Sequence, residues 1–141
     1  MRFLDANIFI YAYYKPKRTL TEKEETIKKE AKNIITNISV GKEQVLTTVV
    51  HISEIVNVLK NGMTKELLTK TILDLFMLDN VIIKDVTKEE YFAAVAIGDD
   101  LNLEPNDALA VDIMHQNNVT EIYSFDEHFN NISDITRLPI I

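Results

Sequence analysis

The chain of 141 residues contains no cysteine and only three glycines, Gly41, Gly62 and Gly98. Without cysteine it has no disulfides, thiol nucleophiles, Cys-ligated zinc ions or iron–sulfur clusters. A phosphate-binding loop needs clustered glycines so that the backbone can approach the phosphate, and these three are far apart. The G-x-S-x-G nucleophile elbow is absent as well. Any chemistry of the chain therefore comes from other residue types.

The chain also lacks long apolar runs. None approaches the ~20 residues of a membrane span, and the N-terminus reaches Asp5 too early for a signal peptide. Hydrophobic residues make up 46% and charged residues 26% of the chain, the balance of a soluble globular protein. We therefore expect a cytoplasmic protein with no membrane partner, built as one domain over residues 1–141.

Acidic residues outnumber basic ones, with 22 Asp and Glu against 15 Lys and Arg, for a net charge of −7. This net negative charge argues against binding of nucleic acid through a broad basic surface. It is compatible with a nucleic-acid enzyme whose acidic site is filled by metal cations.

Apolar segments typical of strands alternate with segments typical of helices. Strands are expected at residues 2–4, 44–48, 81–83, 121–125 and 138–141, and helices at residues 6–14, 21–39, 49–60, 64–78, 87–101 and 105–116. Two of the helices start with capping-box patterns, Thr21 with Glu24 and Thr87 with Glu90. The alternation predicts an α/β fold, a parallel sheet with helices on both faces. In such sheets, sites form beyond the carboxyl ends of the strands.

Four acidic residues fall where such a site forms. Asp5 and Asp126 each close a strand, Glu54 lies in the helix after the second strand, and Asp107 begins a helix. Each has a purely structural alternative. Asp5 and Asp126 could cap the helices that follow them, and Glu54 could be a solvated helix residue. Asp107 could be a first-turn carboxylate that the helix dipole stabilises.

Helical geometry separates two of these acids. At about 100° per residue, Glu54 lies opposite the apolar stripe of its helix, which fits water and a cleft equally well. Asp107 instead aligns with Val111 and Met114, on the side away from Asp112. A carboxylate on an apolar face needs a partner, because desolvating an unpaired charge is costly. Asp107 is therefore the stronger functional candidate.

A common site for the four acids would carry a specific chemistry. Carboxylates in one pocket repel each other, and hard divalent cations such as Mg²⁺ and Mn²⁺ remove that repulsion. A metal held by carboxylates suits phosphodiester hydrolysis, because it activates water, neutralises the phosphate and stabilises the leaving oxygen. No nucleophilic side chain is needed. The convergence of the acids is a hypothesis at this stage, because spacing along the sequence cannot establish it.

The segments around these acids resemble the motifs of the PIN-domain family of metal-dependent ribonucleases. They are residues 3–12 (FLDANIFIYA), 53–59 (SEIVNVL), 106–110 (NDALA) and 124–129 (SFDEHF). Each motif is weak alone, but the four together, in the family's order and across essentially the whole chain, are specific. One departure is the run Leu103-Glu104-Pro105-Asn106, because the family often has Ser or Thr shortly before the third-motif Asp.

The size of the chain is similar to that of the VapC-like toxins of type II toxin–antitoxin pairs. This resemblance implies a three-layer α/β/α sandwich with a mostly parallel sheet of about five strands. It implies an Mg²⁺- or Mn²⁺-dependent endoribonuclease that cleaves RNA with metal-activated water. It further implies a homodimer and a small antitoxin partner. Carried over to this sequence, the resemblance assigns catalysis and metal binding to Asp5, Glu54, Asp107 and Asp126, with Asn7 and Ser124 in support.

Basic and aromatic residues offer further candidates. Lys15, Lys17 and Arg18 form a compact basic patch, which is either an RNA contact or a solvated loop. The tyrosines at 11, 13 and 14 could stack on unpaired bases, although core or dimer packing explains them at least as well.

Two histidines lie near the acids. His51 stands three residues before Glu54 but has no second ligand pair, so we expect a surface or supporting residue and not a metal ligand. His128 follows Asp126 closely and is either a substrate contact or an ordinary turn residue.

Other functions stay open. A PIN-fold protein could serve general RNA processing or decay, or could be a binding module that does not hydrolyse RNA. The presence of all four acids weighs against the binding module. A phosphoaspartate enzyme of the haloacid-dehalogenase type also begins with a strand ending in Asp, but it usually has a second Asp where this chain has Asn7.

Overall fold

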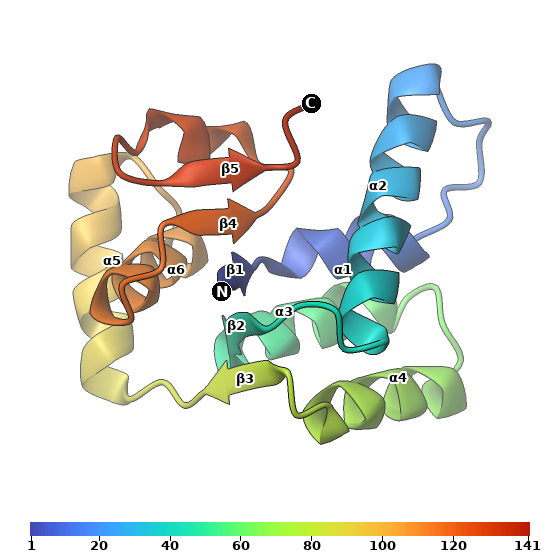
Figure 1. Ribbon diagram of the computed structural model, residues 1–141, viewed down its shortest axis with the longest axis horizontal. Coiled ribbons are helices and arrows are strands. Elements are labelled where there is room, and N and C mark those ends of the chain that lie inside the picture. The colour runs from blue at the N-terminus through green and yellow to red at the C-terminus, as the bar shows by residue number, and fades with distance from the viewer.

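The computed structural model describes all 141 residues and contains a five-stranded sheet with six α-helices (Figure 1). The strands are β1 (Arg2–Leu4), β2 (Val45–Thr48), β3 (Val81–Lys84), β4 (Glu121–Tyr123) and β5 (Thr136–Leu138). The helices are α1 (Ala6–Tyr13), α2 (Glu22–Ser39), α3 (Val49–Leu59), α4 (Lys65–Met77), α5 (Lys88–Leu101), α6 (Pro105–Gln116) and the short 3₁₀ helix η1 (Glu127–Asn131). The predicted alternation of strands and helices is confirmed.

The strands are all parallel and follow the order β3-β2-β1-β4-β5. The chain builds outward from β1 to β3 and then places β4 and β5 on the other side of β1. The direction of winding therefore reverses between β1 and β4. Loops leave such a pair in opposite directions and open a crevice at the carboxyl ends of the two strands. Asp5 and Ser124 are the residues that follow β1 and β4 there.

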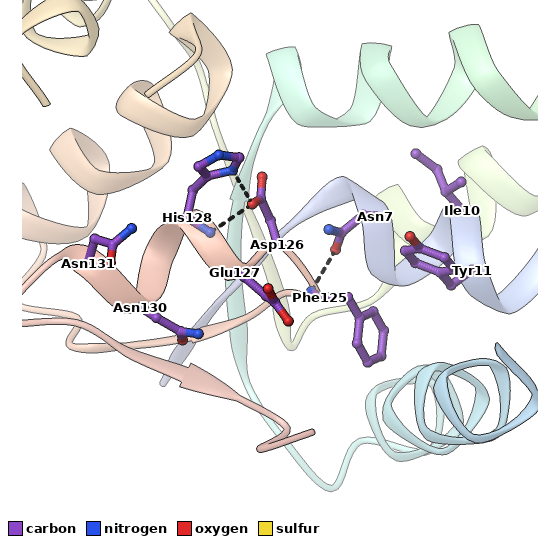
Figure 2. Close-up of a pocket in the computed structure, with 9 residues that line it drawn as sticks. All are labelled: Asn7, Ile10, Tyr11, Phe125, Asp126, Glu127, His128, Asn130 and Asn131. Carbon is purple, nitrogen blue, oxygen red and sulfur yellow. Dashed lines mark hydrogen bonds and ion pairs between the residues drawn. The ribbon is translucent and has the colours of Figure 1, made fainter. Parts of the chain in front are cut away.

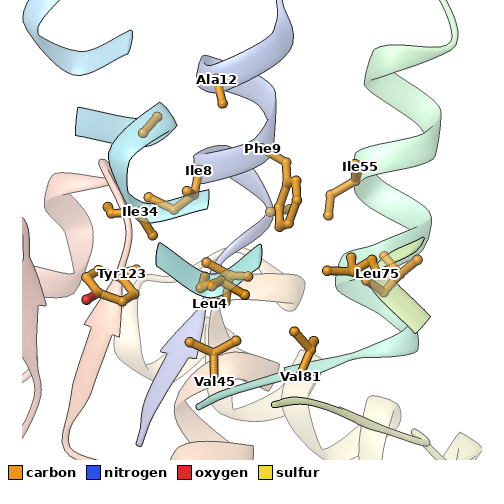
Figure 3. Packing of buried hydrophobic residues seen from close by; sticks show 14 of the residues in the cluster. Leu4, Ile8, Phe9, Ala12, Ile34, Val45, Ile55, Leu75, Val81 and Tyr123 are labelled. Carbon is orange, nitrogen blue, oxygen red and sulfur yellow. The ribbon is translucent and has the colours of Figure 1, made fainter. Parts of the chain in front are cut away.

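Each face of the sheet has its own hydrophobic core, because successive residues of a strand point to opposite faces. Leu4 and Val45 belong to a core with side chains from α1, α2, α3 and α4 (Figure 3). Phe3 and Leu46 belong to a second core, with side chains from α5 and α6. In Figure 1, α5 lies to the left of the strands, and α1, α2 and α4 lie to the right. The helices thus cover both faces, which confirms the three-layer α/β/α prediction.

The helices begin where the sequence predicts. Both capping boxes are formed, with Thr21 and Glu24 at the start of α2 and Thr87 and Glu90 at the start of α5. Pro105 occupies the first turn of α6, where its missing N–H costs no hydrogen bond. No helix combines the length and the apolar character needed to cross a bilayer.

The C-terminal strand was predicted wrongly at residues 138–141. β5 pairs with β4 over residues 136–138, and Pro139 lies beyond it. Proline has no N–H to donate to a strand ladder, so the ladder cannot continue through this residue. The predicted strand at 121–125 is also too long, because β4 ends at Tyr123. Its last two predicted residues belong instead to the loop that carries part of the candidate site.

Candidate active site

The carboxylate of Asp5 is buried at the carboxyl end of β1. Only 4% of the residue is exposed, and Oδ2 accepts a hydrogen bond from the Ser124 hydroxyl at 2.6 Å. Ser124 Oγ in turn accepts from the backbone N–H of Asp126 at 3.0 Å and from Asn7 Nδ2 at 3.3 Å. The backbone N–H of Phe125 donates to Asn7 Oδ1 at 3.3 Å. Asn7 and Ser124 therefore tie the end of β1 to the end of β4.

Asp126 lies in the loop after β4 and caps the N-terminus of η1. Its Oδ1 accepts a hydrogen bond from the backbone N–H of His128 at 2.9 Å and lies 2.7 Å from His128 Nδ1 (Figure 2). The helix-capping alternative is thus confirmed for Asp126. It is wrong for Asp5, whose side chain makes no cap hydrogen bond at the start of α1.

Glu54 is positioned by a residue from a different layer of the fold. Its Oε1 accepts a hydrogen bond from Asn106 Nδ2 at 2.8 Å. The Tyr91 hydroxyl donates to Asn106 Oδ1 at 2.6 Å, which fixes the orientation of the amide. Asn106 directly precedes Asp107, so one short segment of α6 carries one acid and orients another.

His51 is buried, with 1% of its surface exposed, so the expectation that it could lie on the surface is wrong. Its Nε2 lies 3.1 Å from the Asn106 carbonyl and its Nδ1 lies 2.7 Å from Thr48 Oγ1. A carbonyl only accepts, so Nε2 carries the proton and Nδ1 accepts from the threonine hydroxyl. Burial lowers the pKa of His51 to about 4, against a smaller opposing effect of the hydrogen bond to Asn106. His51 is therefore a neutral supporting residue with no nitrogen free for a metal.

The four predicted acids line one cavity of about 400 Å³, which we call the acid cavity. Its wall includes Asp5, Glu54, Asp107 and Asp126, together with Asn7 and Asn106. These residues come from the ends of β1 and β4, from the middle of α3 and from the first turn of α6. The parallel topology thus gathers side chains that are up to 121 positions apart in the sequence.

Burial and mutual repulsion change the pKa values of these acids. Burial raises the pKa of Asp5 to about 7, with the charges of Glu54 and Asp126 adding to the shift and the Ser124 hydrogen bond opposing it. Burial and the neighbouring carboxylates also raise the pKa of Asp107 well above its usual range. Burial acts in the same direction on the pKa of Asp126, but hydrogen bonds from His128 and Asp107 outweigh it and lower this pKa. Of these two neighbours, Asp107 therefore binds a proton more readily than Asp126.

The donors of the acid cavity suit a hard divalent cation. Its charged groups are carboxylates, the ligands that Mg²⁺ and Mn²⁺ prefer, and no Lys or Arg lines it. A bound cation would relieve the repulsion that adds to the effect of burial in raising the pKa values of Asp5 and Asp107. In their present rotamers, no three acids or histidines form a ready-made metal cluster. Asn106 and His128 each hold one carboxylate oxygen, Glu54 Oε1 and Asp126 Oδ1, so a metal would bind through the other oxygen of each group.

The basic patch does not reach the acid cavity. Lys15, Lys17 and Arg18 follow α1, and none of them lines that cavity. Arg18 donates two hydrogen bonds to the Glu24 carboxylate, at 2.6 and 2.8 Å, so its charge is already paired. An RNA contact by this patch stays a prediction.

Asn106 and Tyr91 are the parts of the site that sequence reasoning missed. The position of Asn106 directly before an acid at a helix start is a signal that could have found it. Tyr91 has no such signal, because it reaches Asn106 only through the packing of α5 against α6.

Comparison with protein families decides the relationship. The family model of the PIN domain matches residues 2–135, which include the four acids and both supporting residues. The chain belongs to the PIN-domain family. PIN domains are, as a family, nucleases. The resemblance read from the four sequence motifs is thereby confirmed.

A solved structure shows the same PIN fold. VapC20 of Mycobacterium tuberculosis, a toxin that cleaves the sarcin-ricin loop, matches with a TM-score of 0.68 and a sequence identity of 14%. The match covers 96% of this chain and 97% of that chain. At this identity the similarity establishes the VapC-like fold. Comparison with curated protein sequences gives no significant match.

Proposed function

We propose that this PIN domain is an Mg²⁺- or Mn²⁺-dependent endoribonuclease that uses Asp5, Glu54, Asp107 and Asp126 to bind metal and catalyse hydrolysis. The observation that carries the proposal is the gathering of these four carboxylates around one cavity, at the reversal point of the sheet. Burial, together with repulsion from neighbouring carboxylates, strongly raises the pKa values of Asp5 and Asp107. Such a site is electrostatically unfavourable without a cation and favourable with one.

The chain's own groups have distinct tasks in this proposal. A bound cation would supply an activated water and neutralise charge on the phosphate and the leaving oxygen. Ser124 holds Asp5 at the end of β1, and Asn106 holds Glu54 on the facing side of the cavity. Asp107 gives up its proton when metal binds, because a ligating carboxylate must be ionised. By analogy with the family, the products carry 5′-phosphate and 3′-hydroxyl ends.

A toxin role is the second part of the proposal. The fold match with VapC20 extends over nearly the full length of both chains, and that protein is a toxin that cleaves RNA. We therefore propose a cytoplasmic toxin that forms a homodimer and is inhibited by a small antitoxin. An adjacent short reading frame whose product relieves growth arrest would support this role. A protein of general RNA processing or decay would have no such neighbour.

The nuclease proposal is tested by incubating the purified protein with structured RNAs, with and without Mg²⁺ or Mn²⁺. We expect cleavage only with metal, and none by the Asp107→Asn variant. Asp112→Asn is the matched control, because Asp112 lies on the same helix outside the acid cavity and bonds Gln116. Cleavage that survives in Asp107→Asn, or that is equally fast in EDTA, would reject the assignment.

A further inference from the structure

A larger cavity, which we call the recess, adjoins the acid cavity beside η1. Its volume is about 840 Å³, and Tyr11, Phe125, Asn130 and Asn131 lie in its wall (Figure 2). Asn7 and Asp126 line both the recess and the acid cavity. A strand whose scissile phosphate lies at the four acids and that leaves the acid cavity past Asn7 and Asp126 would carry the nucleotides on that side of the cut over the recess.

One end of the recess is aromatic. The rings of Tyr11 and Phe125 pack edge to face, with their centroids 5.4 Å apart, and Tyr11 keeps 44% of its surface exposed. The other two tyrosines of the sequence cluster do not line the recess. Tyr13 stacks on Phe9 with centroids 6.4 Å apart, and Tyr14 is exposed outside the recess, so Tyr11 is the one tyrosine of the cluster that faces it.

The other end carries two side-chain amides. Asn130 Oδ1 accepts a hydrogen bond from Arg137 Nε at 2.9 Å. A guanidinium only donates, so this contact fixes the orientation of the amide and leaves the Asn130 NH₂ group free to donate to a ligand. The Asn131 side chain makes no hydrogen bond within the protein and is exposed. Asn7 differs from both, because its amide oxygen and nitrogen are already engaged.

The charge of the recess indicates which part of a nucleotide it accepts. No Lys or Arg lines it, and Asp126 and Glu127 supply negative charge. A phosphate has no ion-pair partner there, whereas a neutral base offers a face for aromatic rings and polar edges for amides. Unpaired RNA bases are commonly recognised by this combination of stacking and edge hydrogen bonds.

We propose that the recess binds the unpaired nucleotides next to the scissile bond, and that it does so through their bases. Tyr11 and Phe125 stack on a base, and Asn130 and Asn131 select base identity. The inference rests on the proposed nuclease function and adds to it a base-binding subsite beside the four acids. Stacking tolerates any base, so the two ends make separable contributions: affinity from the rings and sequence preference from the amides.

The test uses a pool of oligoribonucleotides with randomised sequence, cleaved in Mn²⁺, with the cut sites read by sequencing. The wild type should show a base preference next to the cut. Asn131→Ala should still cleave the pool, but the ratio of cleavage at the preferred base to cleavage at other bases should fall at least about fivefold. Tyr11→Ala should lower kcat/KM about tenfold for all sequences alike. Asn61→Ala, an exposed asparagine beyond the end of α3, is the control and should match the wild type.

Asn130→Asp provides a second, near-isosteric readout. The new carboxylate can still accept from Arg137 but offers the ligand an acceptor in place of a donor. The preferred base should therefore change, whereas simple charge repulsion or local unfolding would slow all sequences equally.

The outcomes separate this inference from the function on which it rests. An unchanged base preference in Asn130→Asp and Asn131→Ala, or an unchanged kcat/KM in Tyr11→Ala, would reject base binding by the recess. Neither result would contradict the proposed nuclease function. Cleavage without any preference by the wild type would also reject base binding by the recess. A wild type that cuts no member of the pool overturns both proposals together.

Discussion

Asn106 donates its side-chain amide to the Glu54 carboxylate at 2.8 Å, so a residue of α6 orients an acid on α3. The two residues are 52 positions apart and lie in helices that cover opposite faces of the sheet. Tyr91 holds the oxygen of the same amide, and His51 lies against its backbone carbonyl. Asn106 thus couples the placement of Glu54 to that of Asp107, the next residue in the chain.

Replacing Asn106 with Ala should weaken Mn²⁺ binding and RNA cleavage about 10- to 100-fold, because Glu54 loses its orienting partner. The two quantities are measured by metal titration and by initial cleavage rates. Gln116→Ala, an exposed amide near the end of α6, is the control. Wild-type activity and metal affinity in Asn106→Ala would show that the Glu54 contact is not used.

The stability of the protein should fall in mild acid because of His51. The pKa of His51 is about 4 in the folded protein, where the ring is buried, and 6.5 when the ring is exposed in the unfolded chain. Below about pH 6.5 the unfolded chain therefore binds a proton that the folded chain does not bind, and this favours unfolding. The loss reaches at most about 3 kcal/mol near pH 4. Urea unfolding across this range should show a shallower fall for His51→Gln than for the wild type. Parallel curves for the two proteins would contradict a buried, neutral His51.

The fold could be predicted largely because the strands and helix starts are encoded locally. Apolar strand segments and the caps at Thr21 and Thr87 each identify their elements without tertiary information. The last strand could not be located in this way. Its sequence Thr136-Arg137-Leu138 has no strand pattern of its own, and its position is set by pairing with β4.

The acids that line the acid cavity could also be proposed from the sequence, because Asp5 and Asp126 follow strands and Asp107 lies on an apolar helix face. The surroundings of the acids could not. The burial of His51 depends on the contact of its ring with Phe3, whose centroid is 5.0 Å away, and on the Asn106 carbonyl. These contacts join separate layers, and no local pattern encodes them.

The metal-free protein should become more stable at alkaline pH when Asp107 is replaced with Asn. The raised pKa means that the folded state holds a proton which the unfolded state releases at lower pH, so this contribution to stability is lost as pH rises through the folded pKa. In EDTA, the Tm of Asp107→Asn should exceed that of the wild type at about pH 8 and vary less with pH. Asp112→Asn should follow the wild type. A lower Tm for Asp107→Asn at that pH would contradict the repulsion described for the acid cavity.

Loss of the Ser124 hydroxyl should shift metal binding to higher pH. Burial raises the pKa of Asp5 and the Ser124 hydrogen bond opposes that rise, so Ser124→Ala should raise the pKa further. Mn²⁺ affinity measured against pH should then have its midpoint displaced upward. Ser124→Thr keeps the hydroxyl and should restore the wild-type profile. An unshifted profile in Ser124→Ala would exclude a role for Ser124 in tuning Asp5.

The central claim is that the four carboxylates bind a divalent cation together, and calorimetric titration of Mn²⁺ at neutral pH tests it most directly. The wild type and Asp112→Asn should show a saturable site whose filling releases protons, because Asp5 and Asp107 are partly protonated beforehand. In Asp107→Asn that site should be lost or at least about tenfold weaker. Absence of saturable binding in the wild type, or equal binding in all three proteins, would contradict the claim.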